Sequence, residues 1–209
     1  PFLLEPFHKF IIYNLVGFKL AGTSTVRFHE ALIFIPRKNI KTSFAASLAW
    51  ALSLWYRRSG SKTYIAAAGL MQTLESFNFL DYNVKHMGED QKDGGHVHII
   101  DNNNEHSMEA DLGDGSFYIR ALAANPDAQD SLNCNIAICD EIHAFKQPKQ
   151  YNLFKEAMKA YTNKLLIGIS TAGDNEQLFL GQRLKYCRKV LAGTVKDEQY
   201  SLFAAPQRG

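Results

Sequence analysis

Apolar runs of strand length alternate along the chain with stretches in which apolar residues recur every three or four positions. The runs are rich in β-branched residues and suit a pleated sheet, whereas the second spacing is typical of helices that pack one face against a sheet. The predicted strands cover residues 31–35, 63–68, 96–100, 117–122, 135–139, 164–170 and 200–205. The predicted helices cover residues 5–18, 41–56, 69–82, 151–161 and 177–191. This order predicts an α/β fold with a mainly parallel central sheet flanked by helices.

Residues 83–116 form a polar stretch that interrupts this order. Turn signals such as Asp93-Gly94-Gly95 indicate short strands, with residues 96–100 alternating as an edge strand or hairpin does. The histidines here match no standard set of metal ligands, so a solvated β excursion is favoured over a metal site. They are His86, His96, His98 and His106.

Composition narrows the class of protein. The chain has 209 residues, 46% of them hydrophobic and 21% charged, which predicts one globular domain. Its net charge of +2 gives no argument for nucleic acid. The cysteines lack C-x-x-C spacing, so neither a zinc site nor a disulfide framework is indicated, and a reducing compartment fits. No apolar run approaches the roughly 20 residues that cross a membrane.

The first candidate site follows the predicted strand 31–35. Pro36 ends this strand, and a basic turn then leads into a helix that starts with Lys41 and Thr42. Free N–H groups at a helix start, together with a lysine and a hydroxyl, suit a phosphate and a magnesium ion. The common P-loop G-x-x-x-x-G-K-[ST] has glycine where this chain has Ile35 and Ile40. A basic turn that caps an amphipathic helix is the alternative.

The second candidate site follows the apolar strand 135–139, which ends in Asp140-Glu141. Two carboxylates after a buried strand are costly to desolvate unless they face a site, and in phosphoryl-transfer ATPases they form the Walker B motif. An Asp N-cap followed by a glutamate in a short helix is the alternative. The Lys-Thr turn upstream favours Walker B.

Two further features accompany these motifs. The strand 164–170 ends in Ser170-Thr171-Ala172-Gly173, which fits either a segment that senses the γ-phosphate or a plain polar turn. The helix 177–191 has basic residues on one side, for which a solvated face is favoured over a DNA-binding or partner surface. These residues are Arg183, Lys185, Arg188 and Lys189.

Together these motifs resemble the ATPase domain of the large terminase subunit of tailed phages, of the HK97-like type, over nearly the whole chain. The resemblance rests on residues 7–12 with Gly17-Phe18, on 35–42, on 66–68 with Gln72, on 140–145 and on 170–173. Its Walker A variant lacks the leading glycine but normally has glycine where Ile40 stands. The family also tends to have Trp-Gln where this chain has Phe7-His8.

The resemblance implies a RecA-like P-loop fold and a role for each motif. Lys41 would hold the β- and γ-phosphates, Thr42 and Asp140 the magnesium ion, and Glu141 would orient the attacking water. Arg37 would stabilise charge in cis, and Arg120 is a speculative arginine finger for a neighbouring subunit. Gln72 would lie near the nucleotide or on the DNA path. The residues implied in nucleotide binding are His8, Arg37, Lys38, Asn39, Ile40, Lys41, Thr42, Ser43 and Gln72, and those implied in coupling are Ser170, Thr171, Ala172 and Gly173.

The implied function is Mg²⁺-dependent ATP hydrolysis that drives double-stranded DNA into a procapsid in the host bacterial cytoplasm. The implied partners are the portal protein, the small terminase subunit and sibling subunits in a ring. Residues 1–209 would be a single N-terminal ATPase domain, with 1–30 on the adenine side and 31–209 as the P-loop core. The C-terminal nuclease domain of the family would be absent. The alternatives are a helicase-like translocase and a nucleotide-binding-impaired prophage remnant or assembly module.

Overall fold

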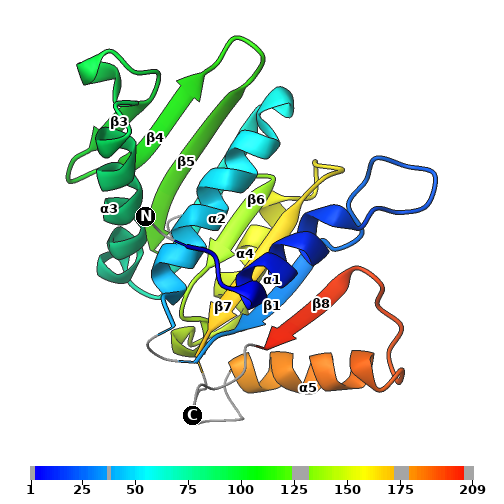
Figure 1. Ribbon diagram of the computed structural model, residues 1–209. Coiled ribbons are helices and arrows are strands. Elements are labelled where there is room, and N and C mark those ends of the chain that lie inside the picture. Colours follow the sequence, from blue (N-terminus) through cyan, green and yellow to red (C-terminus); the bar gives the residue numbers. More distant parts are fainter. Residues whose placement is uncertain (1–2, 37–38, 124–131, 172–178, 205–209) are drawn as a thin grey trace.

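A computed structural model describes residues 3–36, 39–123, 132–171 and 179–204 (Figure 1). Within this part the strands form one eight-stranded sheet in the order β3-β4-β5-β2-β6-β7-β1-β8. Only the β3–β4 and β4–β5 pairs among them are antiparallel, which confirms the predicted mainly parallel sheet with a short excursion at one edge. The strands are β1 (Glu30–Phe34), β2 (Ser61–Ala67), β3 (His98–Asp101), β4 (His106–Asp111), β5 (Ser116–Ala123), β6 (Ile136–Cys139), β7 (Leu165–Ser170) and β8 (Tyr200–Ala204).

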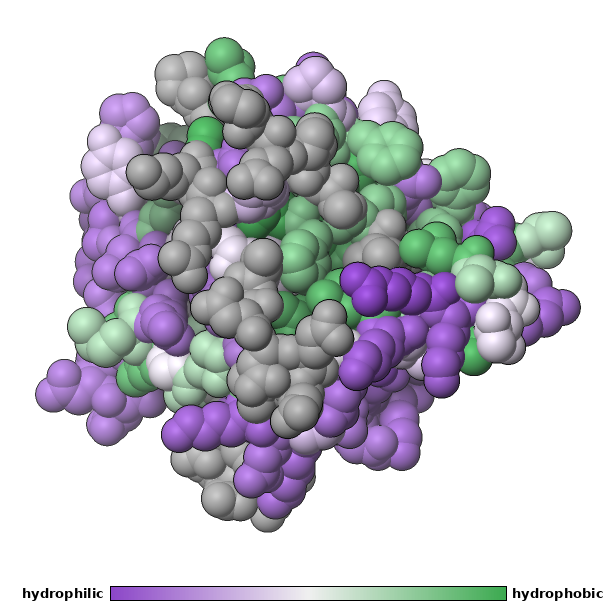
Figure 2. Space-filling model, turned by 90° about the horizontal axis from the view of Figure 1, so that it is seen from below, coloured by the Kyte–Doolittle hydropathy of each residue, from purple (hydrophilic) through white to green (hydrophobic). Residues whose placement is uncertain are grey.

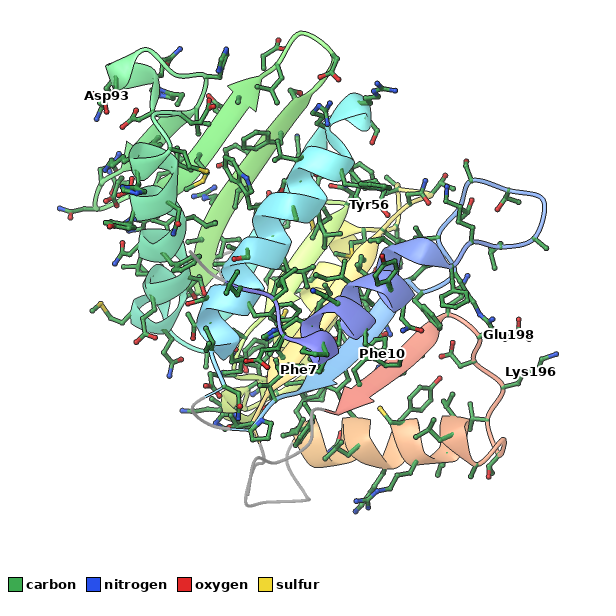
Figure 3. The ribbon with its side chains drawn as sticks, in the orientation of Figure 1. Phe7, Phe10, Tyr56, Asp93, Lys196 and Glu198 are labelled. Carbon is green, nitrogen blue, oxygen red and sulfur yellow. The ribbon has the colours of Figure 1, made fainter. Side chains whose placement is uncertain are left out.

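Helices cover both faces of the sheet and divide its core into two clusters. Buried residues of α1, α2 and α3 pack on one face, and those of α4 and α5 pack on the other. Figure 3 shows α1, which carries Phe7 and Phe10, lying across β1 and β8. The helices are α1 (Pro6–Gly17), α2 (Lys41–Trp55), α3 (Leu70–His86), α4 (Pro148–Ala157) and α5 (Phe179–Leu191). Short 3₁₀ turns are η1 (Arg57–Ser59), η2 (Gln91–Asp93) and η4 (Ile142–Ala144).

Helix ends depart most from the sequence prediction. The helix predicted over 151–161 begins at Pro148 and ends at Ala157. A proline in the first turn needs no N–H partner, so the helix starts before its apolar spacing becomes visible. The helix predicted over 69–82 continues to His86, and the turn after Glu141 is the 3₁₀ turn η4.

The first residue of β1, Glu30, carries a buried carboxylate. Glu30 is 6% exposed, and its Oε2 lies 2.5 Å from Lys155 Nζ on α4. Arg183 on α5 pairs with the other oxygen of Glu30. The Arg183 guanidinium also lies 4.9–5.8 Å from the centres of three tyrosine rings, where cation–π attraction holds it. These rings are those of Tyr151, Tyr186 and Tyr200.

For Arg183 alone, this arrangement corrects the prediction of a solvated basic face on the last helix. Arg183 turns inward because Glu30 would otherwise be a buried, unpaired charge. The other three basic residues of this helix, Lys185, Arg188 and Lys189, are exposed as predicted.

The sheet brings the carboxyl ends of β1, β7 and β6 to one edge. Phe34 of β1 is in register with Ser170 of β7, and Cys139 of β6 is in register with Gly168. The Ile35 N–H donates to the Ser170 carbonyl at 3.0 Å, which extends this pairing past the end of β1. Figure 2 looks from below onto the side toward which β8 and its parallel neighbours point, and hydrophilic and hydrophobic residues both face the viewer there. The three predicted motifs therefore leave the sheet side by side.

Candidate nucleotide-binding site

Helix α2 begins directly at the Lys-Thr pair. Its first helical hydrogen bond runs from the Phe44 N–H to the Ile40 carbonyl at 3.0 Å. The N–H groups of Lys41, Thr42 and Ser43 therefore belong to the open first turn, where the helix dipole is positive. Isoleucine at the N-cap has no side-chain oxygen that could accept from them. This helix start has the properties of an anion-binding site.

Ile40 itself adopts a left-handed backbone, with φ 55° and ψ 32°. This is the region that glycine enters without strain and that a β-branched residue enters at a cost of about 1–3 kcal/mol. Within the described residues, Ile40 and Glu141 are the non-glycine residues with positive φ, and both lie at this site. The backbone thus takes a glycine-like turn at Ile40 although the residue is isoleucine.

Lys41 connects the two predicted motifs across the edge of the sheet. Its Nζ lies 2.8 Å from Asp140 Oδ1 and also pairs with Glu141 Oε1. Lys41 is 9% exposed and Asp140 5%, so both charges are largely desolvated. Burial raises the pKa of Asp140, while the Lys41 ammonium and the Glu141 N–H act in the opposite direction. Partners 99 and 100 positions apart in sequence are thus in direct contact, as expected for Walker A and Walker B.

Two adjoining clefts open beside this cluster, and Thr42, Glu141 and Thr171 line both of them. One has a volume of about 300 Å³ and extends along the helix start. The other has a volume of about 370 Å³ and contains the Asp140 carboxylate as well. A hydroxyl and a carboxylate in one cleft are oxygen ligands of the kind that Mg²⁺ prefers, so the donor set fits this ion. The other residues that line the second cleft are Gln72, Glu75 and His143.

Two of the implied nucleotide contacts occupy different surroundings. Gln72 lies in the first turn of α3, where its Oε1 accepts from the Gly69 N–H at 3.3 Å, and it lines the second cleft. His8 is 1% exposed, and its ring centre lies 4.4 Å from that of Phe44 in α2. A contact between His8 and adenine remains a prediction.

The remaining predicted residues lie partly outside the described part of the chain. Ser170 ends β7, and Thr171, which follows it, lines the second cleft together with Glu141. Arg37, Lys38, Ala172 and Gly173 lie outside the described residues. Asn39 donates from its side chain to the Pro36 carbonyl at 3.1 Å, within the loop itself.

Arg120 lies away from the Lys41 cluster. It lies in β5, in register with Ser107 of β4 on one side and with Tyr64 of β2 on the other. The charges of Arg120 and of the Glu105 carboxylate act in opposite directions on the pKa of the nearby Tyr118. Its role as a finger for a neighbouring subunit remains a prediction.

Sequence reasoning assigned no role to His143 or Glu75. His143 stands inside the quoted motif 140–145, so the motif was the signal that could have identified it. Glu75 reaches the cleft only because α3 begins at the carboxyl end of β2. Its sequence position, in a helix face with other polar residues, gives no comparable signal.

Residues 6–189 match the family described as the ATPase domain of the terminase large subunit. The chain belongs to this family. The match covers most of the chain and includes Lys41, Asp140 and Glu141, which the fold brings together. The resemblance predicted from the sequence is therefore confirmed.

Solved structures show that the fold is shared with several phage terminases. The HK97 bacteriophage large terminase is 23% identical with a TM-score of 0.76, over 100% of this chain and 41% of that chain. The ATPase domain of the Thermus phage P74-26 large terminase is 15% identical with a TM-score of 0.60, over 97% and 86%. A second thermophilic bacteriophage has a large terminase that was solved in complex with ATP-γ-S. It is 11% identical with a TM-score of 0.60, over 95% and 44%. The same terminase has also been solved with ADP.

This terminase ATPase chain spans less than half the length of the HK97 large terminase and of the large terminase solved with ATP-γ-S. No curated protein matches it. The predicted RecA-like fold with a mainly parallel sheet is confirmed by the shared fold. Within the described residues, no helix is both long and apolar enough to span a membrane.

Proposed function

We propose that this chain binds ATP with Mg²⁺ and hydrolyses it. The observation that carries the proposal is Lys41 at the start of α2, with its Nζ 2.8 Å from Asp140 and paired with Glu141. A lysine at an open helix N-terminus and a pair of acids at the end of another strand of the same sheet, here β6, are the parts that P-loop hydrolysis requires. The thermophilic phage terminase complexes with ADP and ATP-γ-S support nucleotide binding by this fold.

Each residue of the cluster has a task that follows from its chemistry. Lys41 leaves the carboxylates for the β- and γ-phosphates, which supply the negative charge that now surrounds its ammonium. Thr42 and Asp140 hold the magnesium ion, which neutralises phosphate charge when it is bound. Glu141, released from Lys41, orients the water for attack on the γ-phosphate. Arg37 adds a positive charge in the loop.

The hydrolysis serves the movement of double-stranded DNA into a procapsid. Family membership supports this role, and the same membership supports the portal protein, the small terminase subunit and sibling subunits in a ring as partners. The working place is the host cytoplasm, at the procapsid. In the ring, Arg120 is the proposed finger for a neighbour, so the isolated chain hydrolyses ATP slowly.

Two substitutions test the hydrolytic site. Lys41→Ala removes the phosphate-binding cation, and Glu141→Gln removes the carboxylate that orients water. Each is expected to lower the turnover of Mg²⁺-ATP by about 100-fold or more, which is the usual effect of deleting one group that stabilises the transition state. Full activity in either variant, measured by phosphate release, would refute the proposal.

Matched controls keep the test specific. Lys62 and Glu109 are exposed residues of β2 and β4 that line a different cavity. Lys62→Ala and Glu109→Gln remove the same charges elsewhere on the sheet and are expected to leave turnover unchanged.

A further inference from the structure

His143 lies between the candidate water-orienting carboxylate and the end of β7. Its Nδ1 is 3.0 Å from Ser170 Oγ, with which it makes a hydrogen bond. The same Nδ1 is 2.9 Å from Glu141 Oε2. One ring nitrogen therefore faces two oxygen atoms that belong to two different candidate motifs.

The surrounding hydrogen bonds assign the proton on this nitrogen. Ser170 Oγ donates its own hydrogen to the Thr171 carbonyl at 2.9 Å, so it must accept from His143. A bare lone pair on Nδ1 would also lie 2.9 Å from a carboxylate oxygen, which is repulsive. Both facts place the hydrogen on Nδ1.

Glu141 Oε2 is the second acceptor that could take this hydrogen. It is buried and, within the described part of the chain, makes no hydrogen bond, although His143 Nδ1 is close enough for one. The other oxygen of the same carboxylate pairs with Lys41. A buried carboxylate oxygen without a hydrogen bond is unfavourable. If the His143 ring turned slightly toward Glu141, the new hydrogen bond to Oε2 would offset the loss of the bond to Ser170.

We propose that His143 is a positioning residue that moves one hydrogen bond between Ser170 and Glu141. This inference rests on the proposed ATPase function. When Lys41 leaves Glu141 for the phosphates, the Nδ1–H of His143 turns to Glu141 Oε2 and fixes the carboxylate that orients water. Ser170 loses its donor at the same moment. The backbone carbonyl of Ser170 accepts a hydrogen bond from the Ile35 N–H, so the change at Ser170 is transmitted to the carboxyl ends of β7 and β1.

Three substitutions of His143 separate this role from simple packing. Asn places a donor N–H near the position of Nδ1, Gln places it near Nε2, and Ala removes it. We expect His143→Ala and His143→Gln to lower kcat by about 100-fold, the cost of a group displaced by about 1 Å, with the Kd for ATP-γ-S changed less than about threefold. His143→Asn is expected to restore most of kcat. Thermal unfolding of the three variants shows whether each is folded.

A second measurement does not depend on turnover. Nitrogen chemical shifts in a ¹⁵N-labelled protein report which ring nitrogen carries the hydrogen, and loss of the signals in His143→Asn assigns them. We expect the Nδ1–H form in the wild type, and a changed Nδ1 shift in Ser170→Ala or on addition of ATP-γ-S. An Nε2–H form, or a shift that neither change affects, would overturn the inference.

The outcomes also separate this inference from the proposed function. A wild-type chain that hydrolyses no ATP would refute the proposed function, while the nitrogen shifts would still test the placement of the hydrogen. A wild type that hydrolyses ATP, with equal kcat in folded His143→Ala and His143→Gln and in the wild type, would overturn the inference alone. Equal losses in the Asn and Gln variants would also overturn it, since the donor position would then be irrelevant.

Discussion

Ile40→Gly tests whether the left-handed turn at the start of α2 is strained. Three contributions to the free energy of unfolding change together. Relief of the left-handed conformation contributes about 1–3 kcal/mol in favour of the variant. Against this, glycine loses about 0.5–1 kcal/mol through the freedom of its unfolded backbone. Ile40 is 52% exposed, so the lost burial of its other half costs roughly 1 kcal/mol more.

These contributions nearly cancel, so Ile40→Gly is expected to change the free energy of unfolding by no more than about 1.5 kcal/mol. Ala51→Gly is the matched control, because Ala51 is an exposed residue inside the same helix. There glycine brings no relief and is expected to cost about 1 kcal/mol. Urea unfolding of both variants measures the difference. A loss of about 2 kcal/mol or more in Ile40→Gly would mean that no strain was relieved, and would refute the reasoning.

The same variant tests the nucleotide site by calorimetry. Because the backbone at Ile40 already has the conformation that glycine favours, the wild type is expected to bind Mg²⁺-ATP. The affinity of Ile40→Gly should differ by less than about tenfold, which corresponds to about 1.4 kcal/mol. Binding that appears only in the glycine variant would contradict this expectation and support an assembly module that no longer binds nucleotide.

Two further substitutions test the packing that supports the site. Arg183→Ala leaves the buried Glu30 with one cation instead of two and is expected to lower the free energy of unfolding by about 3 kcal/mol, measured in urea. Lys185→Ala, in the same helix, should have little effect, and equal losses would contradict the account. Gly168→Ala adds a Cβ 3.0 Å from Ile142 Cδ1, so it is expected to cost about 1–3 kcal/mol and to slow ATP turnover by displacing the turn after Glu141. Turnover equal to that of the wild type would show that the turn tolerates the methyl group.

The sequence was sufficient for the arrangement of the strands at the site. Alternating strands and helices imply a parallel sheet, and parallel strands bring their carboxyl ends to one edge. That reasoning placed Lys41 and Asp140 near each other, and their 2.8 Å contact agrees with it. It could not reveal that Arg183 turns inward, because α5 is basic in sequence and Glu30 meets it only after β1 and β8 pair.

The side-chain contacts at the site could likewise not be predicted from the sequence. The contact of His143 with Ser170 depends on the register of β6 and β7 and on the backbone of Glu141. Neither property follows from local propensity. The motif 140–145 marks His143 as part of a unit but does not say which atoms it meets.

The two left-handed residues both adjoin Lys41, and they differ in what glycine would do there. Glycine at position 40 would keep the function. Glycine at position 141 would lose the carboxylate that orients water, so the strained backbone at Glu141, with φ 52°, is kept because the reaction needs that carboxylate. Comparison of Glu141→Gly with Glu141→Ala isolates that strain, since both variants lack the carboxylate. In a helix alanine is more stable than glycine by about 1 kcal/mol, but in the left-handed region the order is expected to reverse by a similar amount. If urea unfolding finds the alanine variant more stable, the left-handed backbone at Glu141 is wrong, and with it the geometry that leaves Oε2 facing His143.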